Sequence, residues 1–136
     1  MSKYIYKSAT ELAQLIRTGE ATSTEIVKEH IARIKQYNPE LNAVVISMEE
    51  EALKMAAECD NEAKLGNFRG PIHGVPMTVK EQFWVKGTKS TINFKMLKDW
   101  VAPDDALVVE RLKNAGAIIL GKTGTQFSYF CGKISK

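Results

Sequence analysis

The stretch Gly70-Pro71-Ile72-His73-Gly74-Val75-Pro76-Met77-Thr78-Val79-Lys80-Glu81 determines how this chain is organised. Two glycines and a proline in its first half predict a tight turn or a close approach to another segment, because glycine tolerates positive φ and proline fixes φ. The second half alternates between apolar and polar residues. This alternation has the two-residue period of a β-strand, so the stretch predicts a turn that leads directly into a strand.

The sequence also defines the faces and the ends of this predicted strand. Val75, Met77 and Val79 are expected to point to one face. Pro76 has no N–H to donate to a sheet, so it is expected at the first position of the strand. Lys80 then lies at the far end, next to apolar residues.

A lysine in that position has two interpretations. Most lysines are surface cations whose aliphatic stems cover apolar surface, and the spacing alone favours this reading for Lys80. Alternatively, burial can lower a lysine pKa from ~10.4 by up to about 3–5 units and so hold the amine neutral. A neutral amine beside a hydroxyl group can activate that hydroxyl as a nucleophile.

Further segments follow the opening stretch in a recognisable order. They are Lys86-Gly87-Thr88, Ser90-Thr91 and Ala115-Gly116-Ala117-Ile118-Ile119-Leu120-Gly121-Lys122-Thr123. In order and spacing these segments resemble the amidase signature family, and Gly70–Glu81 is similar to its catalytic-lysine segment. Glu81 departs mildly from the pattern, since the family usually has aspartate there.

The resemblance implies both a fold and a mechanism. The fold is α/β, with N-terminal helices packed on a partial mixed, largely parallel sheet, as a truncated amidase signature fold. The mechanism is hydrolysis of carboxamide C–N bonds by a Ser–cis-Ser–Lys triad, in which Lys80 matches the lysine. It implies a small-molecule amide substrate and neither a metal nor another cofactor.

The two serines of the triad are expected to be absent from this chain. In the family they lie in glycine- and serine-rich segments beyond the Gly-Lys-Thr strand, whereas Ser128 and Ser135 lack such flanks. Gly124 replaces the usual asparagine, and Phe127–Lys136 matches nothing recognisable in the family. The isolated chain is therefore expected to be inactive, with an exposed edge strand and with Lys80 more exposed and mostly protonated.

Length and composition predict one domain, residues 1–136, that forms an incomplete N-terminal portion of an amidase signature domain. The net charge of +3 comes from scattered residues, which argues against direct nucleic-acid binding. No run reaches the ~18 apolar residues of a membrane span, and we expect a cytoplasmic protein.

Cys59 and Cys131 form no disulfide framework or zinc spacing, and Cys59 is expected in the core. His30 lies on an apolar helical stripe, where a hydrogen-bonded histidine is the ordinary interpretation.

Local signals predict the remaining elements. Capping patterns start helices near Ala9 and after Thr22, and the second helix is expected to stop before Pro39. A buried strand is expected at 43–46, then a helix with Ala52, Leu53, Ala56, Ala57 and Ala63 inward. Residues 83–100 are expected to form a loop with short helical turns in which Trp84 and Trp100 pack. A helix from Pro103 with Val108, Val109 and Leu112 inward precedes a buried strand at 117–120, with Gly116 between them. Strand, helix and strand in this order predict a crossover with parallel pairing.

One motif has to be rejected. Gly116–Thr123 fits the pattern G-x-x-x-x-G-K-[ST] of a nucleotide-binding loop. Its middle residues, Ala-Ile-Ile-Leu, are those of a buried strand rather than of a loop that cradles phosphates. A helix also precedes the motif, where a nucleotide-binding loop requires a strand.

The sequence thus predicts part of an amidase, with Lys80 as the general base. Two alternatives stay open: part of the A subunit of a tRNA-dependent amidotransferase, and a non-catalytic fragment or interaction module. The residues 94–99 favour the free amidase weakly. An exposed sheet edge could also join two copies into a homodimer.

Overall fold

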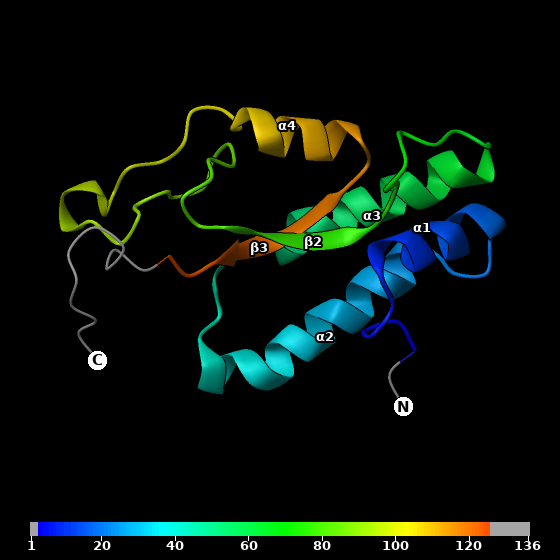
Figure 1. The fold of residues 1–136 in the computed structure, drawn as a ribbon, viewed down its shortest axis with the longest axis horizontal. Coiled ribbons are helices and arrows are strands. Elements are labelled where there is room, and N and C mark those ends of the chain that lie inside the picture. The colour runs from blue at the N-terminus through cyan, green and yellow to red at the C-terminus, as the bar shows by residue number, and fades with distance from the viewer. Residues whose placement is uncertain (1–2, 126–136) are drawn as a thin grey trace.

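The computed structural model of the chain describes residues 3–125. In this part of the chain four α-helices pack in two layers, one on each side of a three-stranded sheet (Figure 1). In chain order the elements are α1 (Ala9–Thr18), α2 (Ser23–Leu41), β1 (Val44–Ser47), α3 (Glu49–Lys64), β2 (Pro76–Lys80), the 3₁₀ helix η1 (Lys95–Leu97), α4 (Leu107–Asn114) and β3 (Ile118–Thr123).

The first two helices begin where the capping patterns predict. The Ser8 hydroxyl accepts the Glu11 N–H while the Glu11 carboxylate accepts the Ser8 N–H, which satisfies two otherwise unpaired donors at the start of α1. Thr22 and Glu25 form the same capping box before α2. Gly19 ends α1 in the left-handed conformation (φ 74°), as expected for a residue that stops a helix.

Two predicted helix boundaries are wrong. α2 continues through Pro39 to Leu41. The proline lies in the last turn, where it removes only one donor, and the Asn42 N–H closes the helix on the Asn38 carbonyl (2.7 Å). α4 begins at Leu107 rather than near Pro103, because the Asp105 carboxylate instead accepts bonds from the Lys86 N–H and the Lys113 ammonium.

The inward faces of the helices agree with the sequence in part. Ala52 and Ala56 are buried as predicted, together with Cys59, whereas Ala57 is exposed. In α4 Val109 is fully buried, but Val108 is 46% exposed. Adjacent helical residues are rotated by about 100°, so a helix that packs against one surface buries Ala56 or Val109 and leaves the neighbouring residue exposed.

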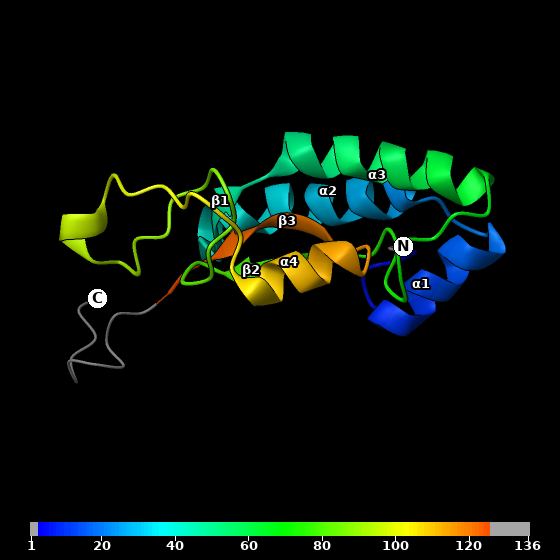
Figure 2. The same ribbon diagram turned by 90° about the horizontal axis from the view of Figure 1, so that it is seen from above.

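The sheet is mixed, as predicted, with strand order β1-β3-β2. β2 and β3 run parallel and are joined through α4, whereas β1 and β3 run antiparallel. We expected β1 to be buried, but Val45 is 43% exposed. The reason is that β1 lies at the edge of the sheet. Figure 2 shows α4 on one side of the sheet and α2 and α3 on the other. The segment that connects β2 to α4 extends beyond one end of the sheet (Figures 1 and 2).

Three apolar clusters hold these layers together. One joins α2 and α3 to Ile118 and Leu120 on one face of β3. Another joins Val109 of α4 to Ile119 on the opposite face, together with Val79 of β2 and Val85. The third packs α1 and the start of α2 around Val75, which precedes β2. Val75 therefore does not share its environment with Val79, contrary to the simple alternation.

Among the helices of residues 3–125, none combines the length and the apolar composition of a membrane span.

Glycines allow the segment before β2 to lie against the segment before β3. The Gly74 N–H donates to the Gly116 carbonyl (2.8 Å), and the Ile118 N–H donates to the Val75 carbonyl (2.9 Å). A Cβ atom on Gly116, which has φ 97°, would lie 2.5 Å from the Cα of His73. A Cβ atom on Gly70 would lie 2.6 Å from the Ala115 carbonyl oxygen. The predicted close approach of the opening stretch is thus confirmed, and it brings β2 beside β3.

Gly116→Ala is expected to destabilise the fold by about 3 kcal/mol, because left-handed strain and a backbone clash add together. Gly66→Ala is the matched control: Gly66 has φ 74°, but a Cβ atom there would have no neighbour within 4 Å, so strain alone should cost about 1 kcal/mol. Urea unfolding of both variants measures the difference. Equal losses for the two variants would mean that the approach of residue 116 to His73 does not constrain the fold.

Candidate active site

Lys80, the predicted catalytic residue, is the last residue of β2 and pairs in register with Thr123, the last residue of β3. Pro76 begins the strand, as predicted. The side chain of Lys80 is exposed, as expected for this chain, whereas its neighbours Val79 and Glu81 are buried. Lys80 thus stands at the carboxyl end of two parallel strands, the edge at which open α/β sheets bind ligands.

Glu81 connects the end of β2 to the segment that follows it. The side chain is only 5% exposed, and its carboxylate accepts the N–H groups of Thr91 and Ile92, the latter at 2.9 Å. Its own N–H donates to the Thr123 carbonyl (2.8 Å). A buried carboxylate needs such donors to replace water. The backbone next to Lys80 is therefore fixed on two sides.

A second lysine, Lys122 in β3, is fully buried. Its ammonium group donates to the Lys89 carbonyl (2.6 Å), to the Ser90 hydroxyl and to the Thr88 hydroxyl (3.4 Å). Burial lowers the pKa of the Lys122 amine, and the negative charge of Glu81 opposes that shift. The rejected nucleotide-binding motif is a strand in this structure, and its lysine is used inside the fold.

A β-bulge determines the direction of Lys122. Along β3 the register with β2 passes from Met77–Ile119 to Thr78–Gly121, so Leu120 is an extra residue. Without the bulge Lys122 would point to the same face as Leu120, towards α2 and α3. With the bulge it points to the face of Ile119, where residues 88–90 lie.

A cavity of about 580 Å³ opens at this end of the sheet. Glu81 and Thr123, the covalent and the register neighbour of Lys80, line it together with Thr91 and Asn93. A larger cavity of about 680 Å³ lies between β1, α3 and residues 86–89, and Glu81 does not line it. Lys80 itself lines neither of these two cavities. The smaller cavity, with its hydroxyl and amide groups, is therefore the one associated with the predicted site.

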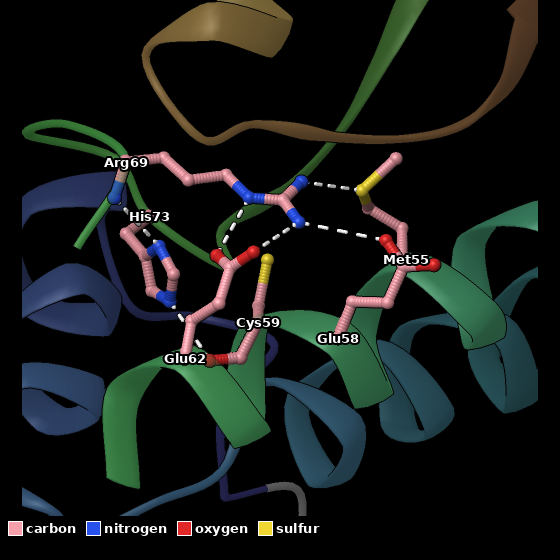
Figure 3. A network of polar contacts seen from close by, with 6 residues as sticks. All are labelled: Met55, Glu58, Cys59, Glu62, Arg69 and His73. Carbon is pink, nitrogen blue, oxygen red and sulfur yellow. Dashed lines mark hydrogen bonds and ion pairs between the residues drawn. The ribbon is translucent and has the colours of Figure 1, made fainter. Parts of the chain in front are cut away.

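A second group of chemically active side chains lies at the other end of the molecule, between α3 and the turn before β2 (Figure 3). Cys59, Glu62 and His73 bring potential metal-ligand atoms within 4.8 Å of one another. Arg69, however, donates to both carboxylate oxygens of Glu62 at 2.7 Å. A bidentate pair of this kind already satisfies the carboxylate.

The other two members of this group are also engaged. Both ring nitrogens of His73 have backbone partners, the Arg69 N–H (3.1 Å) and the Cys59 carbonyl (3.0 Å). Burial raises the pKa of the Cys59 thiol to about 11, and metals bind the thiolate rather than the thiol. The contacts thus describe a structural cluster that links α3 to the opening stretch, and they confirm Cys59 as a core residue. His30 is likewise hydrogen-bonded, to the Ile26 carbonyl (2.8 Å).

Sequence reasoning singled out Lys80 as a candidate and missed the contacts of Lys122 and Glu81. A lysine within a strong apolar run, Ala117–Leu120 followed by Gly-Lys-Thr, is a usable signal of a buried amine. Its partners are backbone and hydroxyl groups of an irregular segment, which no periodicity predicts. Ser128, Ser135 and Cys131 lie outside the described residues. Trp84 and Trp100 pack against each other with ring centroids 4.8 Å apart, as expected.

The comparisons with known proteins identify the family of the chain. The profile of the family described as Amidase matches residues 25–133, which is most of the chain. The chain belongs to the amidase signature family. The match includes residues 127–133, so the expectation that the stretch 127–136 matches nothing in the family is wrong for most of that stretch.

Individual relatives include different kinds of amidase. An indoleacetamide hydrolase of Bradyrhizobium diazoefficiens is 42% identical over 90% of this chain. The A subunit of the glutamyl-tRNA(Gln) amidotransferase of Endomicrobium trichonymphae is 37% identical, also over 90%. The crystal structure of the native peptide amidase from Stenotrophomonas maltophilia is similar over 90% of this chain, with a TM-score of 0.81 and 34% identity.

The chain spans about a quarter of the length of these relatives: 24% of the indoleacetamide hydrolase, 25% of the amidotransferase chain and 26% of the peptide amidase. The observed α/β fold is thus the fold of one part of an amidase signature enzyme.

The contact between Arg69 and Glu62 gives a pH-dependent prediction. The hydrogen bond from Arg69 lowers the pKa of the Glu62 carboxyl below its ordinary value of 4.5. Its stabilising effect is therefore present above pH 4.5 and is lost as the pH falls through the lowered folded-state pKa. Because Glu62 is partly exposed, Glu62→Gln should cost only about 0.5–1 kcal/mol at pH 7 and close to nothing near pH 3.

Glu58→Gln is the matched control, because Glu58 is 3.5 Å from the same guanidinium and more exposed. Urea unfolding of both variants between pH 7 and pH 3 measures these effects. A cost for Glu62→Gln that stays constant over this range would show that the ion pair is not its source.

Proposed function

We propose that this chain provides the general base of an amidase that hydrolyses carboxamides, and that this base is Lys80. The position of Lys80 at the carboxyl end of β2, within the segment that resembles the catalytic-lysine segment of the family, is the observation that carries the proposal. Family membership supports it. We also propose a cytoplasmic location, and the lack of a disulfide framework in the sequence is compatible with it.

The proposed chemistry needs hydroxyl groups from another segment. A neutral lysine amine accepts a proton, through the cis-peptide serine, from the serine that attacks the amide carbonyl carbon. The C–N bond then breaks, the leaving amine takes up a proton, and water releases the acyl group from the serine. Donors that stabilise the oxyanion contribute a large share of such catalysis.

The exposure of Lys80 fits a mechanism in which this chain supplies the base and another segment supplies the serines. An amine acts as a base only in its neutral form, and exclusion of water favours that form. We infer that the part of a complete amidase domain that carries the serines also covers Lys80. The cavity beside Glu81 and Thr123 is where we expect the amide to enter.

Two alternatives remain in play. The first alternative is a role as part of an amidotransferase, which the sequence identity to the A subunits of glutamyl-tRNA(Gln) amidotransferases favours. The second alternative is a non-catalytic interaction module. An amidase hydrolyses simple amides without further subunits, whereas the activity of an amidotransferase part would depend on its partner subunits. Activity towards free amides therefore separates these readings.

The chain alone is expected to show no turnover of simple amides, and Lys80→Ala should change nothing. A chimera provides the positive test, with this chain replacing the aligned segment of the Bradyrhizobium indoleacetamide hydrolase. We expect hydrolysis of indoleacetamide, and a loss in kcat/KM of about 10³-fold in Lys80→Met, as for other triad members. Lys86→Met is the matched control, since Lys86 is an exposed lysine nearby. Full activity of the Lys80→Met chimera would disprove the assignment.

We further propose that two copies of the chain associate through the outer edge of β2. The strand order places β1 and β2 at the edges of the sheet in the described part of the chain. An edge strand presents backbone groups that another strand can pair with. The short length of β2 and its exposed Thr78 and Lys80 would keep such an association weak.

Sedimentation velocity over a wide concentration range is expected to show a dimer that dissociates on dilution. Thr78→Lys should shift the equilibrium towards monomer, because charge on an edge strand opposes pairing. Gln36→Lys adds the same charge on the exposed surface of α2 and should have no effect. A monomer at every concentration would contradict the proposal, as would equal effects of the two substitutions.

A further inference from the structure

Two buried ionisable side chains hold the segment that follows Lys80. Glu81 reaches it from the end of β2, and Lys122 reaches it from β3. The segment itself, residues 88–93, contains no helix or strand, apart from one bridge between Lys89 and Val101. These two side chains act together with backbone hydrogen bonds, such as those from the Ala102 N–H to the Thr88 carbonyl and from the Phe94 N–H to the Thr91 carbonyl.

The part held by Glu81 has an unusual backbone. Ile92 and Asn93 are consecutive non-glycine residues in the left-handed region, with φ of 48° and 55°. A β-branched residue such as isoleucine rarely adopts this conformation, and such strain persists only where surrounding contacts impose it. The N–H groups of Thr91 and Ile92 that enter this turn are the two that donate to Glu81.

The part held by Lys122 lies immediately before this turn. Three successive residues, Thr88, Lys89 and Ser90, accept bonds from one ammonium group through two hydroxyls and a backbone carbonyl. An ammonium group has three donors, so all of them are used. These contacts fix the point at which the chain enters the strained turn.

The same contacts argue against a second catalytic pair. A lysine beside a serine hydroxyl could in principle activate it as a nucleophile. Ser90, however, is 4% exposed, and neither Ser90 nor Lys122 lines the cavity beside Glu81 and Thr123 or the cavity between β1, α3 and residues 86–89. A substrate could not reach this hydroxyl, so the contact serves to position the chain.

We propose that Lys122 is a positioning residue for the Lys80 site. By holding residues 88–90, Lys122 directs the N–H groups of Thr91 and Ile92 onto Glu81 and so fixes the backbone next to Lys80 and one wall of the cavity. The functional meaning of this inference rests on the proposed amidase role, whereas the linkage between Lys122 and Glu81 concerns the chain itself.

Hydrogen exchange of individual amides tests the linkage. Lys122→Met keeps the length of the side chain but removes its donors. It should accelerate exchange at Thr91 and Ile92 about tenfold or more, with little change at Val27 and Ile31 in the core of α2. Lys89→Met is the matched control in the same segment, because the exposed Lys89 side chain makes only a 3.6 Å pair with Asp99. If Lys122→Met does not fold, Ser90→Ala is the milder variant, because it removes only one of the groups that accept a bond from Lys122. It should also accelerate exchange at Thr91 and Ile92.

A spectroscopic titration tests the charge of Lys122 without any loss of structure. The carbonyl oxygen of Lys89 accepts a 2.6 Å bond from the Lys122 amine, so the chemical shift of its carbonyl carbon should follow deprotonation of that amine. Because burial lowers the pKa of Lys122, this inflection is expected below the ordinary value of 10.5. Glu81 is the charged group that acts on Lys122, and the groups that accept its hydrogen bonds are neutral. The inflection should persist in Lys89→Met and disappear in Lys122→Met.

Three results would overturn the proposal. They are unchanged exchange at Thr91 and Ile92, equal acceleration at these amides and in α2, and a Lys89 carbonyl titration that is absent or survives in Lys122→Met. Each of these measurements uses the chain itself and needs no turnover. An inactive chimera would therefore count against the amidase role and leave this result standing.

Discussion

The contact between two backbone turns, residues 70–74 and 115–116, is the constraint on which the rest of the structure depends. These turns precede β2 and β3, and the hydrogen bond from Gly74 to Gly116 sets the two strands parallel and in register. A Cβ atom on Gly70 or on Gly116 would collide with the backbone of the opposite turn and hold the two strands apart. Because both strands start from this contact, their carboxyl ends also coincide, which places Lys80 beside Thr123. The position of the candidate base is therefore decided at the opposite end of the sheet.

The second requirement is that charged groups enter the protein interior at the far end of the same strands. Burying a charge without partners is costly, so Lys122 and Glu81 are tolerable only because an irregular segment supplies acceptors to one and donors to the other. The dependence is mutual, since the N–H groups that lead into the left-handed turn at Ile92 and Asn93 are held by Glu81. Rigidity at the site thus comes from polar contacts, whereas rigidity at the opposite end comes from close backbone packing.

The sequence predicted the parts of this fold that local rules determine. Capping boxes, the strand that starts at Pro76 and ends at Lys80, the parallel pairing and the loop character of residues 83–100 follow from turn chemistry, periodicity and chain order. The errors fall where tertiary contacts override local rules. Asp105 binds Lys113 instead of starting a helix, and β1 is an exposed edge although its sequence is apolar. The bulge that turns Lys122 onto the face of residues 88–90 depends on pairing between strands, which no window of sequence reports.

The two lysines show why a candidate site is harder to predict than a fold. By the usual argument, a buried amine with a lowered pKa marks a functional site, and Lys122 is such an amine. Yet all three donors of Lys122 are used by the protein, whereas the exposed Lys80 lies where an additional layer of structure could meet it. The burial of Lys122 thus reflects its contacts within this chain and does not by itself indicate a catalytic role. The exposure of Lys80 therefore does not argue against its proposed catalytic role, which rests on its position at the end of β2 and on the family segment that contains it.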